Sequence, residues 1–148
     1  MNVVRREMPL LARHAGVWTG TYFYWDAEGN PVDRHRVDIT VELPDQGLYP
    51  YRQLNRYTWP DGRVSETPFQ CACHDKRLWF DHEKIKGSCR ALDDRMMLLE
   101  FEYRHLPGSY VYETIQISDD GQSRSRSAQV FVDDRLHRLT LIHEKRVR

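Results

Sequence analysis

Residues 96–118, MMLLEFEYRHLPGSYVYETIQIS, decide the fold class. Hydrophobic side chains alternate with charged or polar ones in 96–105, and the same period of two returns in 109–118. Alternation of this kind predicts two half-buried β-strands. Pro107 and Gly108 lie between them, and these residue types supply the fixed and the positive φ angles that reverse a chain. The segment therefore predicts an antiparallel hairpin.

The same unit of strand and turn recurs along the whole chain. Clusters rich in Pro, Gly, Asp and Asn return about every eight to twelve residues, which is typical of an all-β sandwich or barrel. The predicted strands are 16–25, 32–43, 49–59, 64–73, 77–81, 84–92, 96–105, 109–118, 123–132 and 135–147. Because short connections favour antiparallel neighbours, we expect a meander, and a meander this long closes into a barrel that hides its edges.

The predicted fold is all-β: a single antiparallel up-and-down β-barrel of about eight to ten strands, similar in type to other closed meanders. One helix is predicted at roughly 6–14, where Met8, Leu10, Leu11 and His14 would form a short apolar face that caps one barrel end. No repeat, linker or low-complexity segment divides the sequence, so we expect one domain over 1–148.

Composition narrows the range of partners. The 148 residues carry 22 Lys and Arg against 22 Asp and Glu, a formal net charge of zero. Nucleic acids and anionic membranes attract a net basic face, so neither is an expected partner. No apolar run reaches the length of a signal peptide or membrane span, which predicts a cytoplasmic protein. All but four of the cations are Arg, the residue type that pairs in ordered positions, so some are expected to be structural.

Period-two alternation sorts side chains into inward and outward sets, because a barrel strand turns its apolar set inward. The predicted inward sets are Met97, Leu99, Phe101, Tyr103 and His105 on 96–105; Val111, Glu113, Ile115 and Ile117 on 109–118; His35, Val37, Ile39, Val41 and Leu43 on 32–43; and His137, Leu139, Leu141 and His143 on 135–144. The alternation leaves open which face of 123–132 points inward.

This sorting places ionisable groups on otherwise apolar faces. Glu113 and His143 are predicted to form an acid and base pair, with Tyr103 and His35 orienting a substrate. Burial beside apolar groups raises the pKa of a carboxyl group, and an adjacent imidazole then shares a proton near neutrality. General acid–base catalysis requires such a pair. The alternative is that Glu113 pairs with a structural arginine and that His143 is a satisfied core or rim histidine.

Aromatic and apolar residues predict a cavity for a small organic ligand, since such pockets are lined by large apolar side chains with a few polar tips. The candidate ligand-binding residues are Trp18, Tyr22, Tyr57, Met97, Leu99, Phe101, Gln129, Phe131 and Leu141.

No metal or other cofactor is predicted. Cys71, Cys73, His74 and Cys89 include zinc-ligand types, but only one closely spaced pair is present and no second Cys pair completes a site. Buried free cysteines are the simpler explanation. An odd number of cysteines also argues against a disulfide framework and suits a reducing compartment.

Residues 11–20, LARHAGVWTG, resemble the opening of a lipocalin-type chain in the calycin superfamily. In that group a short helix or 3₁₀ turn leads into a Gly-x-Trp motif on the first strand, which Gly16 and Trp18 match. The resemblance implies that Trp18 closes the barrel floor and that an arginine near the end of the last strand, here Arg146, packs on it.

Segments 112–121, 129–131 and 139–144 are similar to the C-terminal half of uncharacterised bacterial lipocalin-like domains and, more remotely, of bilin-lyase-type calycins. This likeness implies a ligand cavity without fixing a reaction. Extracellular lipocalins carry signal peptides and disulfides that are not evident here, which argues against a secreted carrier. The sequence also departs after Gly20 from the glycine-rich first strand of haem-binding members, so the resemblance gives His143 no haem role.

Three hypotheses follow. The first is a cofactor-independent enzyme doing acid–base chemistry, an isomerase, cyclase or lyase, on an apolar aromatic or polycyclic metabolite. The second is a non-catalytic intracellular binding protein or chaperone for a hydrophobic metabolite or pigment. The third is a structural dimerisation module with a solidly packed interior, and a homodimer is the commonest assembly of a self-associating chain.

Overall fold

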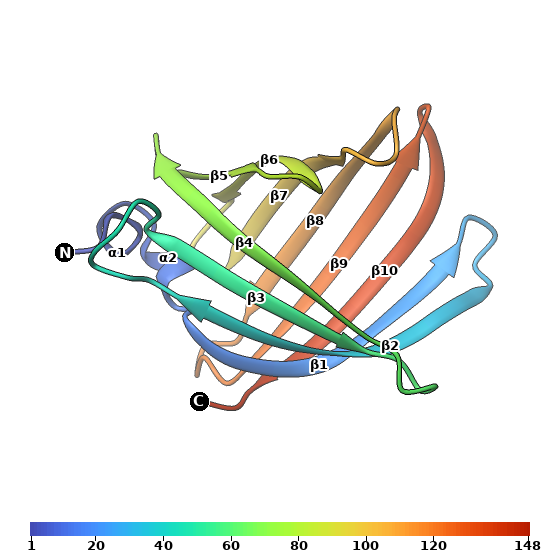
Figure 1. The fold of residues 1–148 in the computed structure, drawn as a ribbon, viewed down its shortest axis with the longest axis horizontal. Coiled ribbons are helices and arrows are strands. Elements are labelled where there is room, and N and C mark those ends of the chain that lie inside the picture. Colours follow the sequence, from blue (N-terminus) through green and yellow to red (C-terminus); the bar gives the residue numbers. More distant parts are fainter.

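The computed structural model describes residues 1–148 as a closed barrel of ten antiparallel strands in a continuous meander, with the last strand paired to the first (Figure 1). The all-β, up-and-down prediction is therefore confirmed. The strands are β1 (Gly16–Asp26), β2 (Pro31–Glu42), β3 (Tyr51–Thr58), β4 (Val64–His74), β5 (Arg77–Asp81), β6 (Ile85–Ala91), β7 (Met96–Tyr103), β8 (Ser109–Ile117), β9 (Ser123–Val132) and β10 (Arg135–Arg146).

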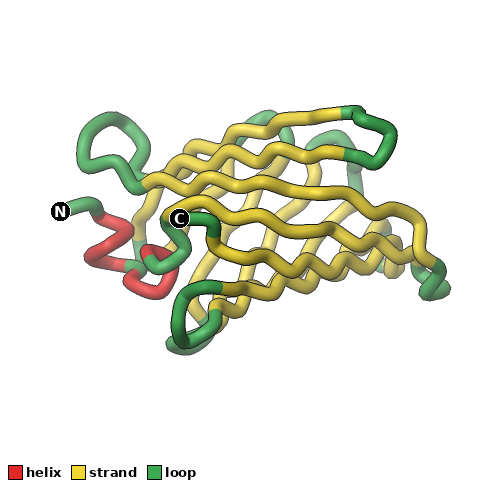
Figure 2. The backbone as a smooth tube through the Cα atoms, turned by 90° about the horizontal axis from the view of Figure 1, so that it is seen from below, coloured by secondary structure: helices red, strands yellow, loops and turns green.

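Two short helices, α1 (Val3–Glu7) and α2 (Pro9–Ala12), lie together at one end of the barrel, which we call the capped end (Figure 2). The sequence predicted one helix over 6–14. The observed helical segment starts earlier because Asn2 accepts hydrogen bonds from the backbone N–H groups of Val4 and Arg5, which makes it an N-cap. It is divided at Met8 because Pro9 disfavours helical geometry in the residue before it.

The same Asn2 side chain fixes the helices to the barrel. Its amide nitrogen donates to the carbonyl oxygens of Pro44 and Pro50, at 2.7 and 2.9 Å, in the loop between β2 and β3. Val4 is fully buried below it. Neither helix is of a length and hydropathy that would carry it across a lipid bilayer.

Trp18 closes the capped end from inside the barrel. Its side chain is fully buried, and its indole N–H donates to the carbonyl oxygen of His14 at 3.0 Å. The guanidinium groups of Arg146 and Arg124 lie over the ring, at 4.3 and 4.6 Å from its centroid. The packing of Arg146 on Trp18 is thus confirmed, and a second arginine joins it.

Gly20 allows β1 and β10 to approach closely beside this floor. A methyl group at this position would overlap the backbone carbonyl oxygen of His143 and the side chain of Glu144. Only glycine fits here, because the obstacle includes backbone that cannot rotate away.

The barrel core forms where the sequence patterns agree with the structure. Val37, Ile39 and Val41 on β2 and Met97 on β7 are all buried in the interior. Charged residues alternate with them on the outer face, where Arg36 pairs with Asp38. The faces predicted for 32–43 and 109–118 are therefore confirmed, and so is that of 96–105 as far as Tyr103. The predicted inward position of His105 is wrong, because β7 ends at Tyr103 and His105 is exposed in the turn that follows.

The face predicted for 135–144 is wrong. Thr140, Ile142 and Glu144 are buried in the interior, whereas Leu141 and His143 are exposed on the outside. Two features reverse the expected pattern. Outward Leu141 pairs with Phe23 of β1, whose ring stacks on Trp25, so the outer surface is apolar there. The inward Glu144 is tolerated because arginines on β9 neutralise it.

The structure also shows which face of β9 points into the barrel. Arg124, Arg126, Ala128 and Val130 are buried, while Ser125, Ser127 and Gln129 are exposed. Two arginines thus point into the barrel, and small hydroxyl side chains point out of it.

Candidate ligand-binding site

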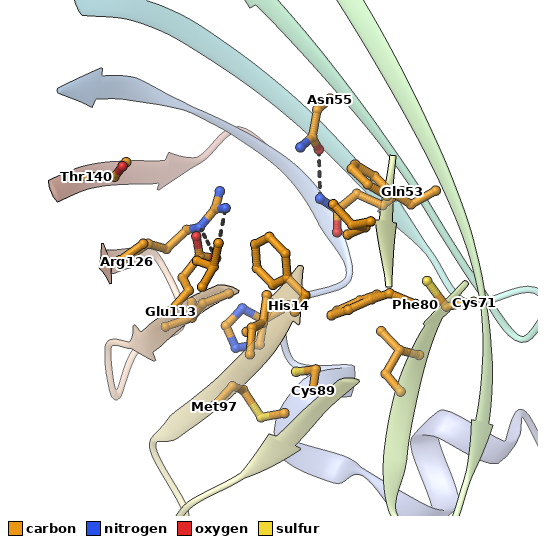
Figure 3. A pocket seen from close by; sticks show the side chains of 18 of the residues that line it. His14, Gln53, Asn55, Cys71, Phe80, Cys89, Met97, Glu113, Arg126 and Thr140 are labelled. Carbon is orange, nitrogen blue, oxygen red and sulfur yellow. Dashed lines mark hydrogen bonds and ion pairs between the residues drawn. The ribbon is translucent and has the colours of Figure 1, made fainter. Parts of the chain in front are cut away.

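The barrel encloses a cavity of about 160 Å³. Figure 3 shows side chains from several strands and from the N-terminal segment converging on it. Twenty-seven residues line it, nineteen of them hydrophobic. The hydrophobic lining includes Leu78, Phe80, Ile85, Met97, Leu99, Phe101, Val111 and Val130. A barrel packed solid, as the third hypothesis requires, is not what the structure contains.

The strand register sets the order of inward side chains from the capped end to the opposite end, which we call the far end. The first row, beside Trp18, holds Gly20, Glu144, Arg124 and Ile117. The second holds Tyr22, Ile142, Arg126, Ile115 and Met97. The third holds Tyr24, Thr140, Ala128, Glu113 and Leu99. The fourth holds Arg138, Val130, Val111 and Phe101.

The first three rows contain a buried network of four charges. Arg124 donates to Glu144 at 2.8 Å, and Arg126 donates to Glu113 at 3.0 Å (Figure 3). Arg126 also lies 3.6 Å from Glu144, which joins the two pairs. Burial alone would raise the pKa of Glu144, but the charges of Arg124 and Arg126 hold it below its usual range. Glu144 is therefore an anion inside the protein.

His14 extends this network as a neutral group. Arg124 lies 3.0 Å from its Nδ1, and because an arginine can only donate, Nδ1 is the acceptor and Nε2 carries the proton. Burial and the nearby charge of Arg124 lower the pKa of His14 to about 3. The ring lines the cavity, 2% exposed, and its Nε2–H has no hydrogen-bond partner in the protein.

A chain of hydrogen bonds runs along the inner face of β3. The hydroxyl of Tyr51 donates to Gln53 at 2.5 Å, the Gln53 amide donates to Asn55 at 2.7 Å, and the Asn55 amide donates to the Tyr57 oxygen at 2.9 Å. Figure 3 shows the step from Gln53 to Asn55. This wall is polar but built from uncharged side-chain types, and its polar groups satisfy one another.

The far end of the cavity contains a third arginine. The Arg138 guanidinium lies 4.2 Å from the centroid of the Tyr24 ring and donates to the Tyr103 hydroxyl at 3.3 Å. Burial raises the pKa of both tyrosines, so each keeps its hydroxyl proton. No carboxylate lies within ion-pair distance of Arg138, in contrast to Arg124 and Arg126.

An aromatic cluster lies behind Tyr22 and Tyr57. The ring of His35 stacks between Tyr22 and Trp59, with centroid distances of 4.9 and 4.6 Å. Its Nδ1 is 3.1 Å from Asp33, which also accepts hydrogen bonds from the indole N–H of Trp59 and the backbone N–H of Arg34. Burial lowers the pKa of His35, although Asp33 opposes this shift. The cluster buries His35 against Tyr22 and Tyr57, which line the cavity, while His35 itself does not.

The cysteines form no metal centre, since no group of three or more His, Cys, Asp or Glu side chains has metal-binding geometry. All three are free thiols. Cys71 and Cys89 line the cavity, and burial raises the pKa of Cys71 to about 12 and that of Cys89 further. Both are therefore protonated and act as small apolar surfaces.

The structure brings together most of the residues predicted for the site. Seven of them line the cavity, namely Glu113, Tyr103, Tyr22, Tyr57, Met97, Leu99 and Phe101. Two more are buried beside it: Trp18, which closes the floor, and His35, which stacks on Tyr22.

Four predicted residues lie elsewhere. His143, Leu141 and Gln129 are exposed on the outside of the barrel, and Phe131 stacks on Tyr110 of the outer face. The predicted inward position of His143 is thus wrong, since its ring contacts Ser125 on the outer surface. Glu113 and His143 are separated by the barrel wall, so the predicted acid and base do not meet. The alternative given for Glu113, pairing with a structural arginine, is what the structure contains.

Sequence reasoning missed the inward arginines and the polar wall of β3. Alternation placed Arg138 on the outside, where charged residues are generally expected. It left the inward face of 123–132 open, and with it the side of Arg124 and Arg126. The excess of Arg over Lys was the available signal, because arginine is the cation that forms ordered pairs in protein interiors. The chain Gln53–Asn55–Tyr57 also has period two and would fit either face.

These features define a class of fold. A closed antiparallel meander, a helical cap, a Gly-x-Trp start with an arginine over the Trp ring, and an internal cavity together give this chain a lipocalin-like barrel fold. The resemblance noted from the sequence is confirmed at the level of fold.

Solved structures agree with this class. A protein of unknown function of the DUF3598 family from Nostoc punctiforme superposes with a TM-score of 0.71 at 19% identity, over 93% of this chain and 49% of that one. The present chain thus spans about half of its length. The S-type phycobiliprotein lyase from Guillardia theta has a TM-score of 0.74 at 14% identity, covering 100% and 94% of the two chains.

Rv2717c from M. tuberculosis has a TM-score of 0.66 at 14% identity, covering 96% and 98%. No protein-family model and no curated protein matches the sequence. At these identities the likeness concerns the fold alone.

Proposed function

We propose that this barrel binds one small, largely apolar aromatic molecule in its interior. The observation that carries the proposal is the cavity itself, closed at one end by Trp18 and the helices and lined mainly by hydrophobic side chains. Apolar enclosure removes ligand surface from water, which is the main source of affinity for such molecules. The lyase likeness supports a ligand-binding role for barrels of this fold.

The cavity volume limits the ligand. About 160 Å³ is close to the roughly 150 Å³ of an engineered apolar cavity that binds benzene. Pockets for drug-sized ligands occupy about 300 to 1,000 Å³. We therefore propose a molecule of one or two rings. A larger polycycle or a linear pigment would require the walls to move apart.

A cavity-blocking variant tests this proposal. Leu99 faces the cavity, and its neighbour Leu98 on β7 faces outward, so Leu99→Phe and Leu98→Phe form a matched pair. Indole and 2-naphthamide are expected to raise the melting temperature of the wild type and of Leu98→Phe, because a ligand that binds only the folded state stabilises it. Neither ligand should raise the melting temperature of Leu99→Phe, because the larger side chain fills the cavity. Equal shifts in both variants, or none in the wild type, would contradict the proposal.

Acid–base catalysis is a second candidate function. The observation that favours it is that Glu113 is the one carboxylate lining the cavity, with the Tyr103 hydroxyl on the neighbouring strand. Glu113 would act as the base in an isomerase, cyclase or lyase, without His143. Compounds that bind should then exchange carbon-bound hydrogen for deuterium in D₂O in the presence of the wild type. Exchange that persists in a folded Glu113→Gln variant would rule out this role.

Location and assembly belong to the same proposal. Three free thiols suit a reducing compartment, so we propose the cytoplasm. We also propose a homodimer as the state to test first, and light scattering on a size-exclusion column measures it directly. A mass near 17.7 kDa would identify a monomer instead.

A further inference from the structure

The fully buried polar atoms of the cavity lining that lack a hydrogen bond are all of one kind. Three lining side chains have a buried nitrogen without a hydrogen-bond partner in the protein: Nε2 of His14, Nε of Arg138, and Nη1 of Arg126, whose nearest carboxylate oxygen, on Glu144, is 3.6 Å away. All three are donors, since Nε2 of His14 carries the proton and arginine nitrogens only donate. Buried donors without acceptors are costly, so they indicate a missing acceptor.

The charges of the lining show the same bias. Three arginines face the cavity, and Glu113 is the only acid among the lining residues. Arg126 is paired with Glu113, and Arg124 with Glu144 behind the lining. Arg138 alone has no carboxylate. Its charge is partly buried and faces only a ring and a hydroxyl, which compensate a cation less well than an anion does.

The position of Arg138 suits the end of an aromatic ligand. It lies in the fourth row with Val130, Val111 and Phe101, one row beyond Glu113 and Leu99. Successive inward rows are about 6 to 7 Å apart along a strand. Arg138 also reaches across the interior from β10 to Tyr103 of β7, whose ring lies 5.5 Å from that of Phe101 between centroids. A ring packed between Leu99 and Phe101 would therefore have its far edge near the guanidinium.

The Tyr103 hydroxyl provides a second donor beside the Arg138 guanidinium. Its oxygen accepts a hydrogen bond from Arg138, so its own O–H is free to donate in addition. An arginine fork beside a hydroxyl donor is an arrangement that recognises a carboxylate.

We propose that the ligand of this cavity is an aromatic carboxylate, with its ring in the apolar interior and its carboxylate on Arg138 and the Tyr103 hydroxyl. This inference rests on the proposed function and names its substrate class. It assigns Arg138 the role of anion-binding residue.

Two isosteric probes test the inference, 2-naphthoate and its neutral analogue 2-naphthamide. Isothermal titration at pH 7.5 is expected to show that the wild type binds the carboxylate at least about tenfold more tightly, as charge-assisted hydrogen bonds allow. Arg138→Gln should remove this preference and leave the amide within about twofold of wild type. Arg135→Gln, an exposed arginine on the same strand, is the control and should change neither affinity.

Tyr103→Phe provides a second measurement that leaves every charge in place. It is expected to weaken 2-naphthoate about fivefold, the loss of one hydrogen bond, and to spare 2-naphthamide. A thermal melt of each variant confirms that it is folded.

The outcomes are distinguishable. If both probes bind the wild type equally, or if Arg138→Gln and Tyr103→Phe keep the preference for the carboxylate, the inference is overturned while the binding function stands. If neither probe binds, the proposed function fails together with the inference.

Discussion

The capped end and the far end of the barrel use the same residue type for different purposes. At the capped end Arg124 is 5% exposed, is bonded to a fully buried glutamate and lies on the ring of Trp18. At the far end Arg138 lies on the ring of Tyr24 in much the same way, but no carboxylate accompanies it. A buried arginine with its carboxylate is part of the framework, whereas one without it has capacity for a ligand.

The largest loss of stability is expected when Arg124 is replaced. Arg124→Met removes the principal partner of Glu144 and leaves a buried carboxylate undercompensated, so the free energy of unfolding should fall by about 3 to 5 kcal/mol. Urea denaturation measures it, with the exposed Arg56→Met as control. A loss below about 1 kcal/mol would mean that this pair does not stabilise the capped end.

A change in pH is expected to have a smaller effect on the free energy of unfolding. The folded state lowers the pKa of His14 to about 3, so between pH 6.5 and 3 the unfolded chain takes up a proton that the folded protein does not. Stability must therefore decrease as pH falls. Between pH 7.5 and 5 this histidine is expected to lower the free energy of unfolding by about 2 kcal/mol.

His14→Gln isolates that contribution. The pKa values of His35 and His82 are lowered as well, but their effects persist in the variant. Unfolding curves at several pH values should give a flatter pH dependence for His14→Gln than for the wild type. Parallel pH profiles would show that His14 is not held neutral by the capped end.

The smallest effect is expected at the far end. Arg138→Met removes a charge that has no carboxylate to leave behind, so the free energy of unfolding should change by less than about 1 kcal/mol in either direction. Comparing this value with that of Arg124→Met is the most direct test of the difference between the ends. Equal losses of unfolding free energy in Arg124→Met and Arg138→Met would show that the two ends of the barrel do not differ in this way.

Much of the site could be predicted from strand alternation. Met97, Leu99, Phe101 and Tyr103 follow a strict period of two beside charged neighbours, and all four line the cavity. Glu113 was found in the same way, as a polar exception on an apolar face. His143 was misplaced because the outward face of β10 is also apolar, so alternation there has no unique interpretation.

The sequence by itself determined the fold class, because turn residues at regular spacing and alternating strands favour a closed meander, which buries one face of every strand and leaves no open edge. It also indicated the Trp18 floor and the apolar lining. Only the tertiary structure decided where the arginines point. Arg124 and Arg126 are tolerated inside the barrel because a carboxylate on another strand faces each of them, and that pairing depends on strand register rather than on local sequence.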